Sequence, residues 1–344
     1  EELPLYLLFI SELLGSDLIY KEEHIDVALE SLNGFLISPK ELPVSLKGIM
    51  HYEPGILAID SLELESDLNR FKGALTLTGK DNTLKNVFTS GSVKLVISEG
   101  SLHVGDFLEK PSYFKNTDTF AISLTAEGPL NELKFKNVKI ANEAVSFDGS
   151  LDVQHLLDPE KPNFLLDIES MEILTASFAE HIPNLEKNNN RYLELLEKIQ
   201  FSGSISSTTK GLKLALLSTN GWGDFSLSGG IGMGFLENQD KNRSFDLSVN
   251  LQDVSLGKFL TNESEYKLSS ELYFKGNVPL SDPMSINWKA TNTSLTSSKL
   301  ALRNISFEGR FQDKILRNTL SINSLPVELK SDALFNFSEE VPLL

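Results

Sequence analysis

The chain has 344 residues, enough for a large hydrophobic core, and carries a formal net charge of −17 with no cysteine. So acidic a chain repels the phosphates of nucleic acid, and we expect no nucleic-acid partner. The lack of cysteine excludes disulfides, thiolate catalysis and cysteine-ligated zinc.

The N-terminal stretch from Leu3 to Leu14, LPLYLLFISELL, is the most apolar part of the chain. It is shorter than the roughly 20 residues that a membrane-spanning helix needs, and it contains Glu12. We therefore expect an amphipathic helix over residues 1–15. The chain starts at Glu1 without a signal-peptide pattern and ends on VPLL, so we also expect an internal fragment of a longer protein.

From about residue 20 onward, apolar and polar residues alternate with a period of two, for example at 93–97, 201–206 and 245–251. This alternation predicts strands with one apolar and one polar face. Helical periodicity is sparse, and after the N-terminus we expect helices only near 175–182 and 191–199. Turn motifs separate the strands: Glu53-Pro54-Gly55, Gly128-Pro129, Asp148-Gly149, Asn220-Gly221 and Asp282-Pro283.

Three stretches align without a gap: VKLVISEGSLHVGDFL from Val93, FLLDIESMEILTASFA from Phe164 and FDLSVNLQDVSLGKFL from Phe245. Each copy predicts a strand, a turn, and a short strand that runs into a helical turn. The copies define approximate repeat units at 20–92, 93–163, 164–244 and 245–340 of one continuous segment, 1–344. So long a sheet has too few helices to cover it. Its apolar face must close into a sandwich or curl into a trough around an apolar guest.

The glycine-rich stretch STNGWGDFSLSGGIGMG, residues 218–234, does not fit a phosphate-binding loop. Such a loop leads from a strand into a helix N-terminus, whereas here strand alternation continues through Phe225, Leu227 and Ile231. Asn220-Gly221 predicts a hairpin turn, and the other glycines favour twist and bending of the sheet.

Catalytic and metal-binding motifs are missing from the sequence. The five histidines, at 24, 51, 103, 155 and 181, have no metal-site spacing, and there is no HExxH, G-x-S-x-G or G-K-[ST] motif. The acidic run at 60–67, DSLELESD, alternates with leucines and predicts the solvated face of a strand rather than a calcium loop. We therefore expect neither an enzyme, nor a metal site, nor a cofactor.

Four stretches carry a resemblance to a known family: Ile168–Leu185, Ile199–Gly230, Ser248–Asn262 and Leu300–Phe311. In order and recurrence they resemble the repeats of TamB-type proteins of the AsmA-like/TamB superfamily (translocation and assembly module), as found in the Bacteroidetes envelope. The resemblance covers roughly residues 20–340. We expect the family's membrane-anchoring N-terminus and its C-terminal domain to lie outside these 344 residues.

The resemblance implies a fold that is mainly β: an elongated, repetitive antiparallel sheet curled into a groove, the β-taco, with a few short helices. It implies a periplasmic protein, anchored in the inner membrane, whose hydrophobic groove transfers phospholipid between the inner and outer membranes. Its implied partners are phospholipid acyl chains and an outer-membrane protein of the BamA/TamA type. The alternative is a structural β-repeat module that scaffolds outer-membrane assembly without binding lipid.

The candidate groove-lining residues are the apolar positions of the alternating strands, with Trp222 and Trp288 as larger wall elements. The lining set is Val93, Leu95, Ile97, Leu133, Phe135, Phe164, Leu166, Ile168, Phe201, Leu212, Leu214, Phe225, Leu227, Phe245, Leu247, Val249, Leu272, Phe274, Ile286, Trp288, Ile305 and Phe307.

Overall fold

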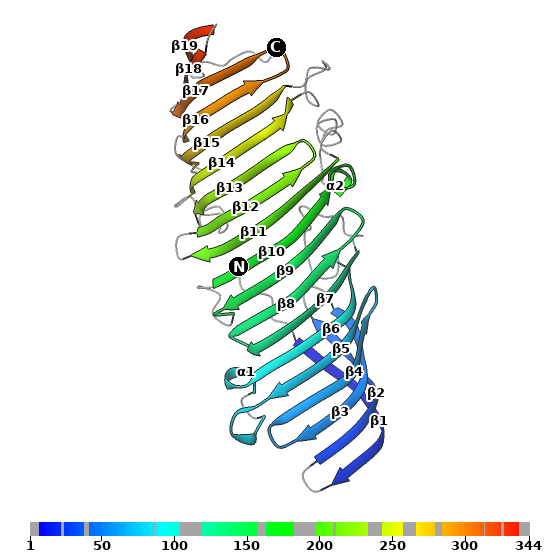
Figure 1. Ribbon diagram of the computed structural model, residues 1–344. Coiled ribbons are helices and arrows are strands. Elements are labelled where there is room, and N and C mark those ends of the chain that lie inside the picture. Colours follow the sequence, from blue (N-terminus) through cyan, green and yellow to red (C-terminus); the bar gives the residue numbers. More distant parts are fainter. Residues whose placement is uncertain are drawn as a thin grey trace. The chain divides into compact units, whose positions relative to one another are not determined.

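The computed structural model describes residues 7–21, 24–37, 41–84, 87–103, 119–156, 163–181, 197–208, 211–232, 243–256, 266–278, 284–312, 314–324 and 327–336. The chain divides into two compact units, Glu1–Leu193 and Glu194–Leu344. Both consist of long antiparallel strands with very little helix (Figure 1). The structure thus confirms the mainly β, antiparallel class that the period-two alternation predicts.

In the first unit, each strand pairs with the next one along the chain in antiparallel orientation. The strands are β1 Leu7–Lys21, β2 His24–Ile37, β3 Glu41–Glu53, β4 Ile56–Ser66, β5 Asn69–Thr78, β6 Ser92–His103, β7 Thr119–Pro129, β8 Glu132–Ala141, β9 Val145–Gln154 and β10 Asn163–Leu174. A 3-10 turn, η1 Lys80–Asn82, and the helix α1 Val87–Ser90 lie between β5 and β6, and the helix α2 Thr175–His181 follows β10.

The second unit repeats this arrangement, and its consecutive strands also pair in antiparallel orientation. Its strands are β11 Lys198–Thr208, β12 Gly211–Asn220, β13 Gly223–Gly232, β14 Ser244–Ser255, β15 Lys267–Asn277, β16 Ser285–Thr296, β17 Ala301–Gln312, β18 Ile315–Ser324 and β19 Val327–Asn336. The expected hairpin at Asn220-Gly221 is confirmed, because Gly221 and Trp222 connect the neighbouring strands β12 and β13.

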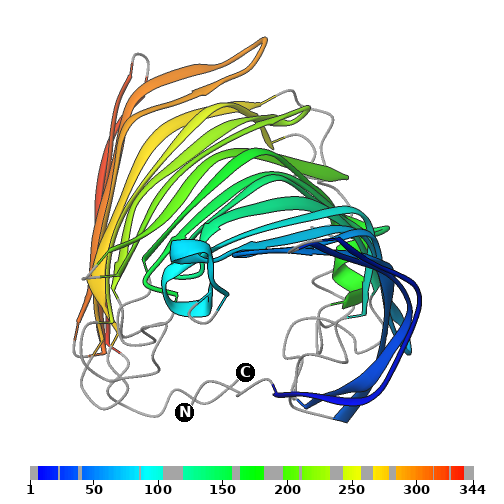
Figure 2. The ribbon, with the colours of Figure 1, turned by 90° about the horizontal axis from the view of Figure 1, so that it is seen from below.

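Bulges near the middle of the strands recur in both units. In the first unit the bulged strands are β2, β4, β6, β8 and β10, each of which has one residue more than the neighbouring strand at the bulge. In β4, for example, Ile59 and Leu62 are three positions apart, whereas their partners in β5, Leu75 and Gly73, are two apart. In the second unit β14, β16 and β17 do the same. A bulge bends its strand and increases the local twist. The strands of each unit are accordingly bent along their length (Figure 2).

Small polar residues provide the backbone conformation that several of these bulges need. Ser61, Asn137, Asp253, Asn292 and Asn304 all have φ between 51° and 52°. This left-handed region is sterically costly for most side chains, whereas Asn and Asp adopt it more readily than other residues. Each of these residues lies inside or beside a register shift. The left-handed backbone conformation at these bulges therefore explains both the residue type at each position and the place where the strand bends.

The bulges correct one expectation about the three aligned repeats. The predicted turn between two strands does not exist in the second and third copies. Their residues form single long strands, β10 and β14, each interrupted by a bulge. The first copy is likewise one strand, β6, up to His103. The expected helical turn is confirmed in the second copy, where α2 contains Ala176 and Phe178; in the other two copies it lies outside the described residues.

The N-terminal amphipathic helix is a wrong prediction for the residues that the structure describes there. Leu7–Lys21 is the strand β1, paired with β2 from Leu7 opposite Ile37 to Lys21 opposite His24. The leucine-rich run fits a strand as well as a helix, and β2 offers it a pairing edge. Residues 1–6 lie outside the described residues, as do 191–196 of the second expected helix, whose last two residues, Lys198 and Ile199, belong to β11.

The predicted turn at Asp148-Gly149 is also wrong, because both residues lie inside β9. Gly149 faces Val138 of β8 and Ile168 of β10, the two points at which those strands are bulged. A Cβ atom on Gly149 would lie 2.2 Å from the carbonyl oxygen of Asp167. The glycine is therefore required by the close approach of a neighbouring backbone and not by a reversal of the chain.

Candidate functional site: the apolar face of each unit

In the first unit, the strand register places one apolar side chain per strand in a continuous row from β2 to β10. Residues directly opposite each other in adjacent antiparallel strands point to the same side of the sheet. The row is Val27, Met50, Ile59, Leu75, Leu95, Ala126, Phe135, Leu151 and Leu166. No polar residue interrupts it.

The second unit has a corresponding row from β12 to β18. It consists of Leu216, Leu227, Val249, Leu272, Ala290, Phe307 and Leu320. A parallel row contains Leu214, Gly229, Leu247, Phe274, Trp288, Gly309 and Asn318. Each unit therefore has one face that is apolar along the direction in which the strands follow one another.

The bulges keep these faces apolar along each strand. On β14, Phe245, Leu247, Val249 and Leu251 occupy alternate positions, and the next apolar residue is Val254, three positions on. In a strand without a bulge, a residue three positions after Leu251 would point to the polar side. With the bulge, Val254 stays on the apolar face and is only 6 % exposed. Ile59 and Leu62 of β4, and Phe135 and Val138 of β8, have the same spacing across a bulge.

The predicted lining residues all lie on these faces. Val93, Leu95, Ile97, Leu133, Phe135, Phe164, Leu166 and Ile168 belong to the first unit. Phe201, Leu212, Leu214, Phe225, Leu227, Phe245, Leu247, Val249, Leu272, Phe274, Ile286, Trp288, Ile305 and Phe307 belong to the second. The predicted lining set lacks Val27, Met50, Ile59, Leu75 and Leu151, although the same alternation marks them. Whether any of these residues contacts lipid stays a prediction.

Most of these side chains are only partly covered by protein. Of the lining set, only Leu133, Ile168 and Leu214 are 9 % exposed or less, and Phe307 is 37 % exposed. The helices of the described part of the chain are four and seven residues long, and each contacts mainly one strand, β7 or β10. Among the described residues, therefore, no second layer of structure covers the apolar faces. A continuous apolar face that is left partly exposed favours a binding role.

Small hydroxyl side chains also lie on the apolar face of the second unit. Ser218 of β12 is 2 % exposed and donates to the carbonyl oxygen of Gln200 at 2.5 Å. Ser270 of β15 and Thr293 of β16, 4 % and 8 % exposed, bond to each other at 2.7 Å. Because these groups are satisfied within the sheet, they add little polarity to the face.

Aromatic side chains give the face of the second unit its largest contacts. Phe201 and Phe225 meet edge to face, with ring centroids 5.8 Å apart, and Trp222 stacks on Phe225 at the same separation. Trp288 lies against Gly309 of the next strand, where a Cβ atom would be 2.4 Å from the indole carbons Cε2 and Cζ2. The indole thus fills the space that the glycine leaves.

Charged side chains lie on the opposite, polar face. Arg70 and Glu65 pair at 3.1 Å, and Lys72 and Glu63 at 3.9 Å, so the predicted solvated face of the acidic run 60–67 is confirmed. These pairs are exposed and each contributes little stability. A hydrogen bond and charge attraction from Lys136 lower the pKa of the Glu127 carboxyl on the same face.

Histidine and carboxylate side chains are the candidate metal ligands of the described ranges, since the chain has no cysteine. No three His, Cys, Asp or Glu side chains gather there in a way that could hold a metal ion. His51 sits between two carboxylates, with Nδ1 2.7 Å from Asp26 and Nε2 3.5 Å from Asp60, as an exposed cluster on the polar face. Within the part of the chain that the structure describes, no helix has the length and apolar character of a membrane span.

Comparisons with known proteins do not identify this chain. Neither a family model, nor a curated protein, nor a solved structure matches it. The class defined by fold and site is therefore a repetitive antiparallel β-protein with one apolar face in each unit. The family resemblance of its motifs stays a hypothesis.

Proposed function

We propose that this chain is a periplasmic segment of a TamB/AsmA-like bridge protein, anchored in the inner membrane outside this segment. In this proposal the apolar faces form a hydrophobic groove for phospholipid acyl chains, which pass between the inner and outer membranes. The groove supports outer-membrane assembly together with a partner of the BamA/TamA type. No catalytic residue or cofactor is needed.

The observation that carries the proposal is the uninterrupted apolar row from Val27 to Leu166. An acyl chain that leaves a bilayer exposes CH₂ groups at a cost of about 0.8 kcal/mol each. A row of apolar side chains, most of them half-buried, offsets that cost along the strands and holds no single position tightly. Movement along the row then requires no barrier comparable to full hydration of the chain.

Bending of the strands supports a groove in preference to a flat face. The bulges occur in alternate strands of the first unit at similar heights, so their bends add up across the sheet. Six apolar residues of these strands are less than 9 % exposed, and all but Leu133 flank the bulges: Leu29, Ile59, Leu62, Val138 and Ile168. This burial pattern is expected on the inner side of a bend.

Photocrosslinking from adjacent leucines on opposite faces tests the proposal. In the first unit Leu166 lies on the apolar face, whereas its neighbour Leu165 is 47 % exposed on the polar face. In the second unit Leu216 and Leu217 form the same kind of pair, with Leu217 58 % exposed. With p-benzoylphenylalanine at each position and phospholipid vesicles, we expect lipid adducts at Leu166 and Leu216 and only background at Leu165 and Leu217.

The result distinguishes the groove from the scaffolding alternative. Equal yields at both members of each pair would show non-specific lipid contact and would contradict the proposal. Absence of adducts at Leu166, Leu214, Leu216 and Leu247 alike would favour a structural module that binds no lipid.

A further inference from the structure

Two arginines face each other directly on the polar side of the second unit. Arg310 of β17 is paired in register with Arg317 of β18, so both guanidinium groups project from the same side of adjacent strands. Like charges directly opposite each other destabilise an antiparallel pair. The arrangement is unexpected in a chain with 48 acidic and 31 basic residues, which offers many carboxylates for such positions.

Two carboxylates, those of Asp246 and Glu308, lie on the same face as the two arginines, but neither forms an ion pair with them. Asp246, in the same transverse row, is paired with Lys275 at 2.9 Å. Glu308 lies directly opposite Lys289. Within the described ranges, neither Arg310 nor Arg317 has a carboxylate partner, and Arg310 Nη2 donates instead to the neutral side chain of Gln312.

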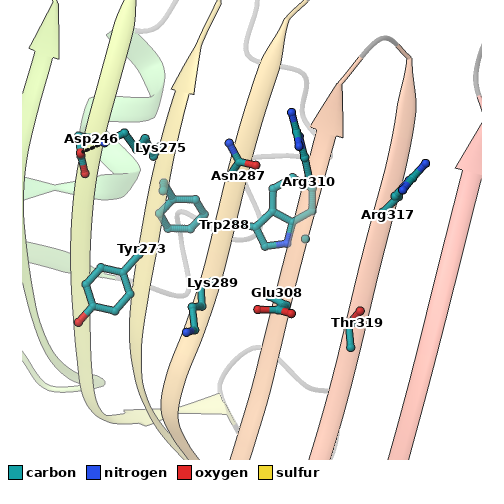
Figure 3. A pocket seen from close by; sticks show the side chains of 12 residues that line it. Asp246, Tyr273, Lys275, Asn287, Trp288, Lys289, Glu308, Arg310, Arg317 and Thr319 are labelled. Atoms are coloured by element: carbon teal, nitrogen blue, oxygen red, sulfur yellow. Dashed lines mark hydrogen bonds and ion pairs between the residues drawn. The ribbon is translucent and has the colours of Figure 1, made fainter.

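Two surface depressions are lined by both Arg310 and Arg317. A shallow depression on the polar face is lined by Lys275, Asn287, Lys289, Arg310 and Arg317, among others (Figure 3). A second, smaller depression is bounded by Arg310, Gln312, Ile315 and Arg317. Figure 3 shows Asn287, Arg310 and Arg317 on three consecutive strands along one edge of the first depression. Arg310 and Arg317 line both hollows, with the amides of Asn287 and Gln312 beside them.

We propose that Arg310 and Arg317 form a binding site for a phosphate group, with Asn287 and Gln312 as neutral hydrogen-bond donors. Guanidinium groups bind phosphate through paired N–H donors, and two of them on adjacent strands reach one tetrahedral oxyanion from two sides. The anion removes the repulsion between the arginines, which explains why an acidic chain keeps them adjacent. The site lies on the polar face and does not depend on any apolar guest.

Binding of phosphate by the full chain at low ionic strength tests the site, because exposed charges are screened by salt. The probes are inorganic phosphate, measured by calorimetry, and vesicles of phosphatidylcholine with or without phosphatidylglycerol, measured by flotation. We expect Arg317→Gln to weaken binding roughly tenfold, since it removes one charged donor fork. The matched control is Arg303→Gln, an equal change of charge at an exposed position of the adjacent strand β17.

A second variant separates loss of the site from loss of the fold. Arg317→Glu places a carboxylate opposite Arg310, so we expect a higher melting temperature together with complete loss of phosphate binding. Binding of inorganic phosphate supports recognition of the free group. Binding only to phosphatidylglycerol vesicles, lost in Arg317→Gln, supports a phosphate carried by lipid. An equal loss in Arg303→Gln, or no binding of either probe, overturns the proposal.

Discussion

At the scale of single residues, the pairing of Glu127 with Lys136 connects the charge pattern of the polar face with the pH dependence of stability. Lys136 of β8 lies diagonally across from Glu127 of β7 and donates a hydrogen bond to its carboxylate. Lys94 and Lys134 add smaller attractions. These contacts lower the pKa of Glu127 below its ordinary value of 4.5.

Replacement of Lys136 by Met is therefore predicted to raise the pKa of Glu127 toward 4.5. A carboxyl whose pKa is lowered by folding stabilises the fold above its unfolded pKa, and this contribution is lost as the pH falls through the lowered value. The variant should melt below the wild type at neutral pH and match it in strong acid. Carboxyl ¹³C chemical shifts and thermal melts measure both effects. Lys139→Met, which removes a pair with Asp148, should leave the pKa of Glu127 unchanged.

Residue-scale features differ in how far the sequence predicts them. Trp288 follows from alternation as a wall residue, since Ile286 and Ala290 lie on either side of it at a spacing of two. Its contact with Gly309 cannot be predicted from alternation, because the two residues are 21 positions apart and meet only through the register of β16 and β17. The same holds for Arg310 and Arg317, whose proximity requires the hairpin register of β17 and β18.

At the scale of elements, the strands were predictable and their bends were not. Ile59-Asp-Ser-Leu62, Phe135-Lys-Asn-Val138 and Leu251-Gln-Asp-Val254 each place two polar residues between apolar ones. Such a break looks like a turn when only alternation is followed, and the repeat alignment led to that wrong prediction. The third residue of each tetrapeptide has a left-handed backbone, which Ser, Asn and Asp provide. This tetrapeptide pattern is the sequence feature that could have identified the bulges.

Deletion of single residues from β14 tests the function of the bulge. Removal of Asp253 should convert the step from Leu251 to Val254 into regular pairing with Ser270 and Leu268, and all apolar side chains keep their face. Removal of Ser248 should instead turn Val249 and Leu251 to the polar face and Asn250 and Gln252 to the apolar one. We expect the first variant to stay within about 1–2 kcal/mol of the wild type, and the second to lose several kcal/mol.

Urea denaturation compares the free energies of unfolding of the two deletion variants. Lower lipid crosslinking at Leu216 in the Asp253 deletion, with stability retained, would show that the bend and not the face alone serves binding. Equal destabilisation by the two deletions would contradict the assignment of Asp253 as the extra residue.

At the scale of the whole chain, the alternation predicted which residues share a face, because period two fixes the side of every residue between bulges. It failed at the N-terminus, where the leucine-rich run satisfies helical and strand spacing alike and only pairing with β2 decides between them. It also left open what the faces bind. Sandwich and trough have the same alternation and differ only in what covers the apolar side.

A buried charge on the apolar face distinguishes an open trough from a closed sandwich. Leu214 is only 9 % exposed, so an arginine there destabilises either structure, whereas Leu247 of β14 is half-buried. We predict that Leu247→Arg folds, with its guanidinium reaching solvent over an uncovered face, and lowers lipid crosslinking at Leu216 to the background at Leu217. Ser248→Arg, on the polar face of the same strand, should change neither property.

Thermal unfolding followed by circular dichroism decides between the two structures. In a closed sandwich the arginine at position 247 would be buried without a partner, which costs several kcal/mol and lowers the melting temperature sharply. In a trough the cost is limited to the apolar contacts that Leu247 makes with Gly229 and Phe274 on the neighbouring strands. Ser248→Arg adds the same charge to the polar face and serves as the control. If Leu247→Arg unfolds while Ser248→Arg stays folded, the open groove is excluded.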